Sequence, residues 1–292
     1  MQTKHSPGEI NDSSTQQILC ELCTIKCTFE AMKALQLIFR YVKYFFAAKT
    51  KHSAQAPFLY EFITIVLNKK SDDQNCKNIE QLRRGLCKSE DTIKITDFGA
   101  GSHVNDNKTR KIKDVAKNSA KNSKFGKLLY RITQFYKPKN ILELGTSLGI
   151  STLYLAKANK ESKVHTLEGC PETAKVAQQN FKKLDAKNTS ITLGDFNNTL
   201  ESKLEEIRTI DLAFIDGNHQ EKPTIDYFEK CLKYANNNTI FIFDDVHWSE
   251  GMENAWNYIK THQKTTLTID LFYVGVVFIK SELSKENFII KF

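Results

Sequence analysis

The 292-residue sequence has few prolines and glycines and no long apolar run. Its five prolines and twelve glycines are too few for a fibrous or low-complexity chain. No stretch reaches the ~18 uncharged apolar residues that a membrane-spanning helix requires. The first residues, from Met1, are polar and lack the apolar core of a secretory signal. With 40% hydrophobic and 26% charged residues, we expect a globular, cytoplasmic protein.

Cysteine is present, but its number and spacing do not form a disulfide framework or a complete metal site. Seven is an odd number, and without an export signal reduced thiols are the default. Cys20, Cys23 and Cys27 have a spacing that could suggest a metal site. No second Cys/His pair follows nearby, however, and three thiolates make an incomplete zinc site. We interpret residues 1–31 as a poorly ordered extension.

The basic charge is concentrated in one segment. The formal net charge is +8, and residues 108–127 carry many lysines and arginines that are opposed only by Asp114. A basic surface can attract RNA, anionic membranes or acidic small molecules. Near-helical spacing of the charges is more typical of a solvated helix face, and no recognisable RNA-binding module accompanies it. We therefore expect no nucleic-acid partner.

Residues 32–124 are predicted to form a helical region that caps the substrate site. Residues 34–48 have the pattern of an aromatic-rich helix, and Pro57 precedes a second helical run. The first helix could lie on a membrane surface, but Arg40 and Lys43 do not form a full polar face. We favour a cap over a substrate cleft, or a homodimer contact through these helices.

Residues 125–292 are predicted to form a Rossmann-like α/β domain with a doubly wound, mostly parallel seven-stranded sheet. From residue 139, short apolar runs alternate with helical stripes, as in parallel sheets that are covered on both faces. The last two apolar runs have no helix between them and must pair antiparallel. The sheet should thus end in a C-terminal antiparallel hairpin. The runs that we assign to strands are 141–144, 164–167, 191–193, 212–215, 240–243, 267–271 and 274–279.

A glycine-containing turn and three later residues predict an adenosine pocket at the carboxyl ends of the strands. Gly145–Ser151 link the first strand to its helix, where glycine permits close ligand approach and the helix N-terminus offers N–H donors. Glu168, about 20 residues beyond the turn, is positioned to accept both hydroxyls of a ribose. Asp195 could accept from an adenine amino group, and Phe196 could lie against the base. The turn lacks the Gly-x-Gly-x-x-Gly spacing that cradles a pyrophosphate, so a ribose without phosphates fits better.

These residues give the sequence a resemblance to the class I S-adenosylmethionine-dependent methyltransferases over about residues 125–280. The matching segments are Glu143-Leu-Gly-Thr-Ser-Leu-Gly-Ile-Ser151, Glu168-Gly169, Gly194-Asp195-Phe196 and the terminal hairpin. The resemblance implies that S-adenosylmethionine is the cofactor. It also implies that the turn, with the Ser151 hydroxyl, holds the methionine part, while Glu168 and Asp195 bind the ribose and the adenine. The predicted cofactor residues are Glu143, Gly145, Thr146, Ser147, Gly149, Ser151, Glu168, Gly169, Asp195, Phe196 and Asp216.

Three carboxylates and two histidines follow the fourth and fifth strands. Asp216 and His219 follow one strand, and Asp244, Asp245 and His247 follow the next. Acids brought together at one sheet edge repel each other unless a cation binds, and oxygen ligands suit magnesium or manganese. We predict Asp216, Asp244 and Asp245 as metal ligands and His219 as the general base, with His247 in reserve. In the alternative, Asp216 only contacts the cofactor and the acid pair caps the next helix.

Together these features predict metal-assisted O-methylation of a small-molecule hydroxyl group. Asp216-x-x-His219 with paired acids looks more like the macrolide-sugar O-methyltransferases, whereas catechol-type enzymes carry Asp-Asn after the fifth strand. Two alternatives stay open: RNA or protein methylation that uses residues 108–127, and a non-catalytic cofactor-binding or membrane-surface adaptor built around residues 34–48. A second Gly-rich stretch at 95–102 precedes polar residues, so we interpret it as a loop near the substrate.

Overall fold

The computed structural model describes residues 32, 34–49, 57–68, 73–96, 108–119 and 123–292. The predicted extension 1–31 and most of the second Gly-rich stretch lie outside the described residues. The chain forms two compact units, residues 1–46 and 47–292, which we describe separately. In the first unit, the predicted aromatic-rich helix is present from residue 34 and continues to residue 47. The domain boundary near residue 124 stays a prediction.

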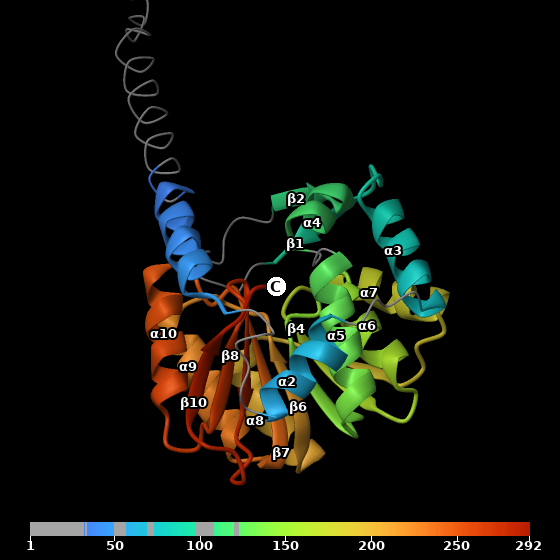
Figure 1. The fold of residues 1–292 in the computed structure, drawn as a ribbon. Helices are drawn as coiled ribbons and strands as arrows, with labels where there is room; N and C mark the ends of the chain where they lie inside the picture. The colour runs from blue at the N-terminus through green and yellow to red at the C-terminus, as the bar shows by residue number, and fades with distance from the viewer. Residues whose placement is uncertain (1–31, 33, 50–56, 69–72, 97–107, 120–122) are drawn as a thin grey trace, which may run out of the picture. The chain divides into compact units, whose positions relative to one another are not determined.

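The second unit is built around an eight-stranded mixed sheet (Figure 1). In spatial order its strands are β10 (Glu286–Ile289), β8 (Leu267–Asp270), β9 (Val274–Phe278), β7 (Ala235–Asp244), β6 (Ile210–Ile215), β3 (Asn140–Leu144), β4 (Lys163–Glu168) and β5 (Thr189–Leu193). The strands from β7 to β5 run parallel, and β9 is antiparallel to both β7 and β8. The predicted doubly wound sheet with its terminal hairpin is therefore confirmed.

Helices cover both faces of the sheet because successive strand residues point to opposite sides. In β3, Ile141 packs into one apolar cluster and Leu142 into the other. The first cluster includes residues of α2 (Pro57–Glu61), the π-helix η2 (Phe62–Leu67), α3 (Gln74–Leu86), α5 (Ser123–Tyr136), α6 (Ile150–Ala158) and α7 (Pro171–Lys183). The second includes residues of α8 (Phe196–Ile207), α9 (Glu221–Leu232) and α10 (Glu250–Thr261). The sheet is thus buried on both faces, which explains its continuous apolar strands.

Two strand pairings differ from the sequence-based expectation. Strand β10 adds an eighth strand, which pairs parallel to β8 at the edge of the sheet. Residues Lys108–Lys111, expected on a solvated helix face, form β2, which pairs antiparallel with β1 (Thr92–Ile95). Helix α4 (Ile112–Ser119) begins only after this strand. Both strands are four residues long and carry charged side chains, so the backbone pairing that forms them has little signature in the sequence.

Among the described residues, no helix has both the length and the hydropathy needed to cross a membrane.

Candidate active site

The carboxyl ends of the parallel strands open into a cavity of about 500 Å³. Ligands of open α/β sheets bind at this edge, where neighbouring strand ends leave a crevice. Ten of the predicted cofactor, metal and catalytic residues line the cavity. They are Gly145, Ser147, Glu168, Gly169, Asp195, Phe196, Asp216, His219, Asp244 and Asp245.

Gly145 starts the turn after β3 in a conformation that other residues rarely adopt. Its φ is +99°, and a Cβ at this position would lie 2.1 Å from the carbonyl oxygen of Asp216. Its N–H donates to the Leu167 carbonyl at 3.0 Å, and the Asp216 N–H donates to the Leu144 carbonyl at 2.9 Å. Glycine is therefore required for the ends of β3, β4 and β6 to come this close together.

Glu168, at the end of β4, contacts the turn directly. One carboxylate oxygen accepts the N–H of Ser147 at 2.7 Å, and the other accepts the N–H of Cys170 at 2.9 Å. Burial raises the pKa of Glu168, and these backbone hydrogen bonds oppose the rise. Each carboxylate oxygen can accept more than one hydrogen bond, so the group can also accept hydroxyls from the cavity. The predicted proximity of Glu168 to the turn is thus present in the structure.

Asp195 and Phe196 lie at the start of α8, on the far side of Glu168 along the sheet. Asp195 caps this helix by accepting the N–H of Asn197 at 2.9 Å, and its side chain also lines the cavity. The ring of Phe196 packs edge-on to Tyr227, with 5.9 Å between ring centroids. A Cβ on Gly217 would lie 2.6 Å from the Phe196 ring, so the glycine leaves room for that ring. The two aromatic rings give this end of the cavity an apolar wall.

Four predicted cofactor residues do not line the cavity but lie in or beneath the turn. Glu143 is fully buried, and desolvation raises its pKa to about 7 against opposing hydrogen bonds from nearby hydroxyls. Thr146 is buried within 2.6 Å of the Thr166 hydroxyl. Gly149 is the N-cap of α6 with a φ of +80°, and Ser151 is buried in the first turn of that helix. Their positions indicate that they shape the turn.

An acidic cluster lies on the opposite side of the cavity, at the ends of β6 and β7. Donor atoms of Asp216, His219 and Asp244 all lie within 4.8 Å of one another. His219 Nε2 is 3.4 Å from Asp216 Oδ1. Asp245 lines the same cavity without belonging to this close group. The N-cap of α10 is Ser249, which accepts the N–H of Met252, so the acid pair does not cap that helix.

Strained backbone is concentrated around the cavity. Among the described residues, eight residues other than glycine have a positive φ. Four of these line the cavity, namely Ser147, Asn218, His219 and Asp245. Such conformations persist where the surrounding structure enforces them, and they are common at functional sites. The strain therefore supports a functional role for both sides of the cavity.

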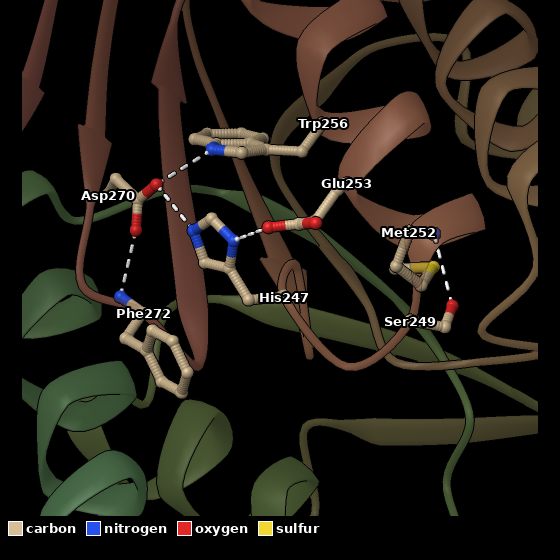
Figure 2. A network of polar contacts seen from close by, with 7 residues as sticks. All are labelled: His247, Ser249, Met252, Glu253, Trp256, Asp270 and Phe272. Carbon is tan, nitrogen blue, oxygen red and sulfur yellow. Dashed lines mark hydrogen bonds and ion pairs between the residues drawn. The ribbon is translucent and has the colours of Figure 1, made fainter. Parts of the chain in front are cut away.

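His247 is held between two carboxylates and is not among the residues that line the cavity. Figure 2 shows its imidazole between Glu253 and Asp270. Nδ1 lies 2.9 Å from Glu253 Oε1, and Nε2 lies 2.8 Å from Asp270 Oδ2. Asp270 also accepts hydrogen bonds from the Trp256 indole and from the N–H of Phe272. Burial lowers the pKa of His247, but the two carboxylates outweigh this effect and raise it overall. Both ring nitrogens thus contact carboxylates, and the network ties the loop after β7 to α10 and to the terminal hairpin.

Replacing His247 by alanine should destabilise the fold. The change leaves the buried carboxylate of Asp270 without its charged partner, and breaking a buried ion pair costs about 3 kcal/mol or more. Thermal denaturation should show a midpoint lowered by several degrees. His165→Ala is the matched control, because that ring contacts one hydroxyl, Ser190, at 3.1 Å. Equal midpoints for the two variants would mean that the network contributes little to stability.

The cavity also contains residues outside the predicted cofactor, metal and catalytic sets. Thr96 follows β1, Asn118 lies in α4, and Tyr227 lies in α9. The first two come from outside the strand–helix alternation, and Tyr227 reads in the sequence as an ordinary core position. Burial raises the pKa of Tyr227, whose side chain is almost entirely covered. Thr96 belongs to the stretch 95–102 that we expected near the substrate, whereas no pattern in the sequence connects Asn118 or Tyr227 to the cavity.

Known proteins are similar to the part of the chain that contains this cavity. Residues 142–246 match the model of a methyltransferase domain. A catechol O-methyltransferase of Niastella koreensis is 35% identical over 124 residues, which cover 41% of this chain and 55% of that protein. A catechol O-methyltransferase of Mycobacterium tuberculosis is 28% identical over 123 residues, covering 41% and 54%. The chain thus spans about half the length of the curated relatives that it matches.

Solved structures share the fold at lower identity. A Podospora anserina methyltransferase with bound SAH has a TM-score of 0.55 and 17% identity, covering 72% of this chain and 89% of that one. The O-methyltransferase TomG of Streptomyces achromogenes, solved with SAM, has a TM-score of 0.52 and 16% identity, covering 75% and 94%. The fold of this chain is therefore that of known methyltransferases. Residues 142–246 are thus similar to a methyltransferase domain, and the chain has the fold of solved methyltransferases.

Proposed function

We propose that this chain transfers the methyl group of S-adenosylmethionine to a hydroxyl group of a small molecule, assisted by a divalent cation. The observation that carries the proposal is that one cavity contains two different chemical sides. On one side, the Glu168 carboxylate is hydrogen-bonded to the glycine-containing turn. On the other side lies the cluster of Asp216, His219 and Asp244. A nucleoside and an acceptor held at these sides would share a single enclosed space.

The nucleoside side of the cavity suits S-adenosylmethionine. Glu168 would accept the two ribose hydroxyls, with the Ser147 N–H holding its carboxylate in place. Asp195 would accept from the adenine amino group, and Phe196 would lie against the base. The turn after β3 would hold the methionine part. When bound, the cofactor supplies a methyl group on a positively charged sulfur.

The acidic side has the donor set of a divalent-cation site. Asp216 and Asp244 offer oxygen atoms, and His219 offers a nitrogen within the same 4.8 Å group. Asp245 lines the cavity beside them and would complete the set directly or through water. Oxygen-rich sites of this kind suit magnesium or manganese. A bound cation would lower the pKa of an acceptor hydroxyl that coordinates it.

His219 is the residue that we assign as the general base. Its ring is about one-third exposed, and its Nε2 lies 3.4 Å from Asp216. A histidine has an intrinsic pKa near working pH, so it can take the acceptor's proton as the oxygen attacks the methyl group. Holding the acceptor and the cofactor in line within one cavity would supply much of the acceleration. His219 thus accepts the proton while the neighbouring acids fix its position.

His219→Ala should reduce kcat by about 10²-fold, because general base catalysis contributes on that order. The Kd for S-adenosylhomocysteine should change little, since the ring lies on the acidic side of the cavity. Steady-state rates and calorimetric titrations measure the two quantities separately. An unchanged kcat would reassign the base. A higher Mg²⁺ concentration needed for half-maximal activity would instead indicate that His219 acts as a metal ligand.

The basic segment gives weaker support to a macromolecular acceptor. Lys111 and Lys113 both pair with Glu90, Lys111 at 2.9 Å. Their hydrogen bonds lower the pKa of Glu90 to about 2. Two of the cations in residues 108–127 thus pair with a carboxylate of the same chain, which is why the segment gives weaker support to a macromolecular acceptor.

The proposal is tested by formation of S-adenosylhomocysteine from S-adenosylmethionine with panels of acceptors. We expect turnover with a small hydroxyl compound, either a catechol or a sugar with free hydroxyl groups, when Mg²⁺ or Mn²⁺ is present. Full activity in excess chelator would remove the cation from the mechanism. Turnover with RNA or protein but with no small molecule would replace the proposed acceptor class.

A further inference from the structure

The helix at residues 34–47 carries many exposed apolar side chains. The described chain has fourteen exposed large apolar side chains, and eight of them lie on this helix or at Met32 just before it. Phe39 is 71% exposed and Phe46 82%. The other six are Met32, Leu35, Ile38, Tyr41, Val42 and Phe45. Contiguous apolar surface of this kind marks an interaction site.

The spacing of these residues makes the helix amphipathic. Leu35, Ile38, Val42 and Phe45 recur at steps of three and four residues, so they lie on one side of an α-helix. Gln36, Arg40 and Lys43 recur at the same steps and form a narrow polar stripe. At 1.5 Å per residue the helix is about 21 Å long, shorter than the ~30 Å apolar core of a bilayer. The amphipathic pattern of this described segment is typical of a helix that lies in a membrane surface.

The charges around the helix select the kind of surface. The sequence has no Asp or Glu from residue 31 to residue 60, whereas Arg40, Lys43, Lys49 and Lys51 are all basic. Basic residues beside an aromatic apolar face are typical of helices that bind anionic lipid headgroups. Residues 34–47 contain no acid, so the same helix of a second copy would offer no opposite charge to this stripe. A planar anionic surface could cover the broad apolar side of the helix and also pair with the basic residues of the polar stripe.

We propose that helix 34–47 binds the surface of an anionic lipid bilayer, with its apolar side in the interface and Arg40 and Lys43 at the headgroups. This function is separate from methyl transfer. It would hold the enzyme at a membrane surface and favour acceptors that are dissolved in or attached to that surface.

The test is co-sedimentation of the full chain with vesicles of phosphatidylcholine, either alone or mixed with phosphatidylserine. We expect binding to the mixed vesicles that weakens with added salt and is much weaker on the neutral ones. Phe39→Ser combined with Phe46→Ser should reduce this binding at least about tenfold, because two buried aromatic rings are lost. Tyr60→Ser is the matched control, since Tyr60 is 55% exposed but lies in α2.

Light scattering on the same samples separates this proposal from a homodimer. The proposal is overturned if the wild-type chain binds neither kind of vesicle. It is also overturned if the wild-type chain is a dimer that the double substitution converts to a monomer without changing lipid binding. Circular dichroism of the variants checks that each one is folded. Because vesicle binding needs no turnover, failure of the proposed methyl transfer would leave this result unaffected.

Discussion

Asp244→Ala and Asp216→Ala should each reduce methyl transfer by about 10³-fold or more, the loss expected when a cation that stabilises transition-state charge is no longer held. Both carboxylates lie in the close donor group, and Asp244 is almost fully buried at the end of β7. The measurement is kcat for S-adenosylhomocysteine formation at saturating Mg²⁺. Asp185→Ala is a suitable control, because Asp185 is an exposed acid whose recorded partner is Lys187 on the surface.

Two further readouts separate a lost metal site from a lost fold. Thermal denaturation of the Asp244 variant should show a folded protein, since removing one of several close carboxylates also relieves their mutual repulsion. Titration with Mn²⁺ should show weaker binding to the variant than to the wild type. Retention of more than about a tenth of the wild-type rate, a difference near 1.4 kcal/mol, would exclude an essential role for either acid.

Glu168→Ala should weaken the binding of S-adenosylhomocysteine by about 10² to 10³-fold. In the proposed cofactor site, the variant would lose two charge-assisted hydrogen bonds to the ribose, together worth roughly 3–4 kcal/mol. It also leaves the Ser147 N–H without the acceptor that holds it at 2.7 Å. Calorimetric titration of wild type and variant gives the two Kd values directly.

The controls for Glu168 differ in what they retain. Glu172→Ala removes an exposed acid that pairs with Lys175 one turn into α7, and it should leave the Kd unchanged. Glu168→Gln keeps one acceptor oxygen but loses the charge, and it should fall between wild type and Glu168→Ala. Equal Kd values for wild type and Glu168→Ala would mean that the ribose binds elsewhere.

The parts of the fold that the sequence predicts are those with a strong physical signature. The sheet strands are buried on both faces, so β6 and β7 appear as unbroken apolar runs. The turn at Gly145 needs a positive φ and a close backbone approach, which restricts the residue type. Glu168 follows the Gly145 turn at the sequence separation that a strand–helix–strand unit sets. These features are set locally or by simple periodicity.

The remaining parts depend on contacts between distant segments. Strand β10 is short, and it forms because β8 leaves an edge for it to pair with. The sequence left His247 as a second candidate for the general base. In the structure its two ring nitrogens contact Glu253 and Asp270, which lie 6 and 23 residues away in the sequence. Thr96 and Asn118 reach the cavity from outside the alternating segments. Tertiary packing determines the positions of all these residues, and the pattern of a single segment does not predict that packing.

The most direct test of the nucleoside site is a crystal structure of the full chain soaked with S-adenosylhomocysteine. We predict density in the cavity at the strand ends, with the ribose hydroxyls on the Glu168 carboxylate and the adenine beside Phe196. An empty cavity at saturating ligand, or a nucleoside bound away from the Gly145 turn, would contradict the assignment of the cofactor site and of the methyl transfer proposed from it.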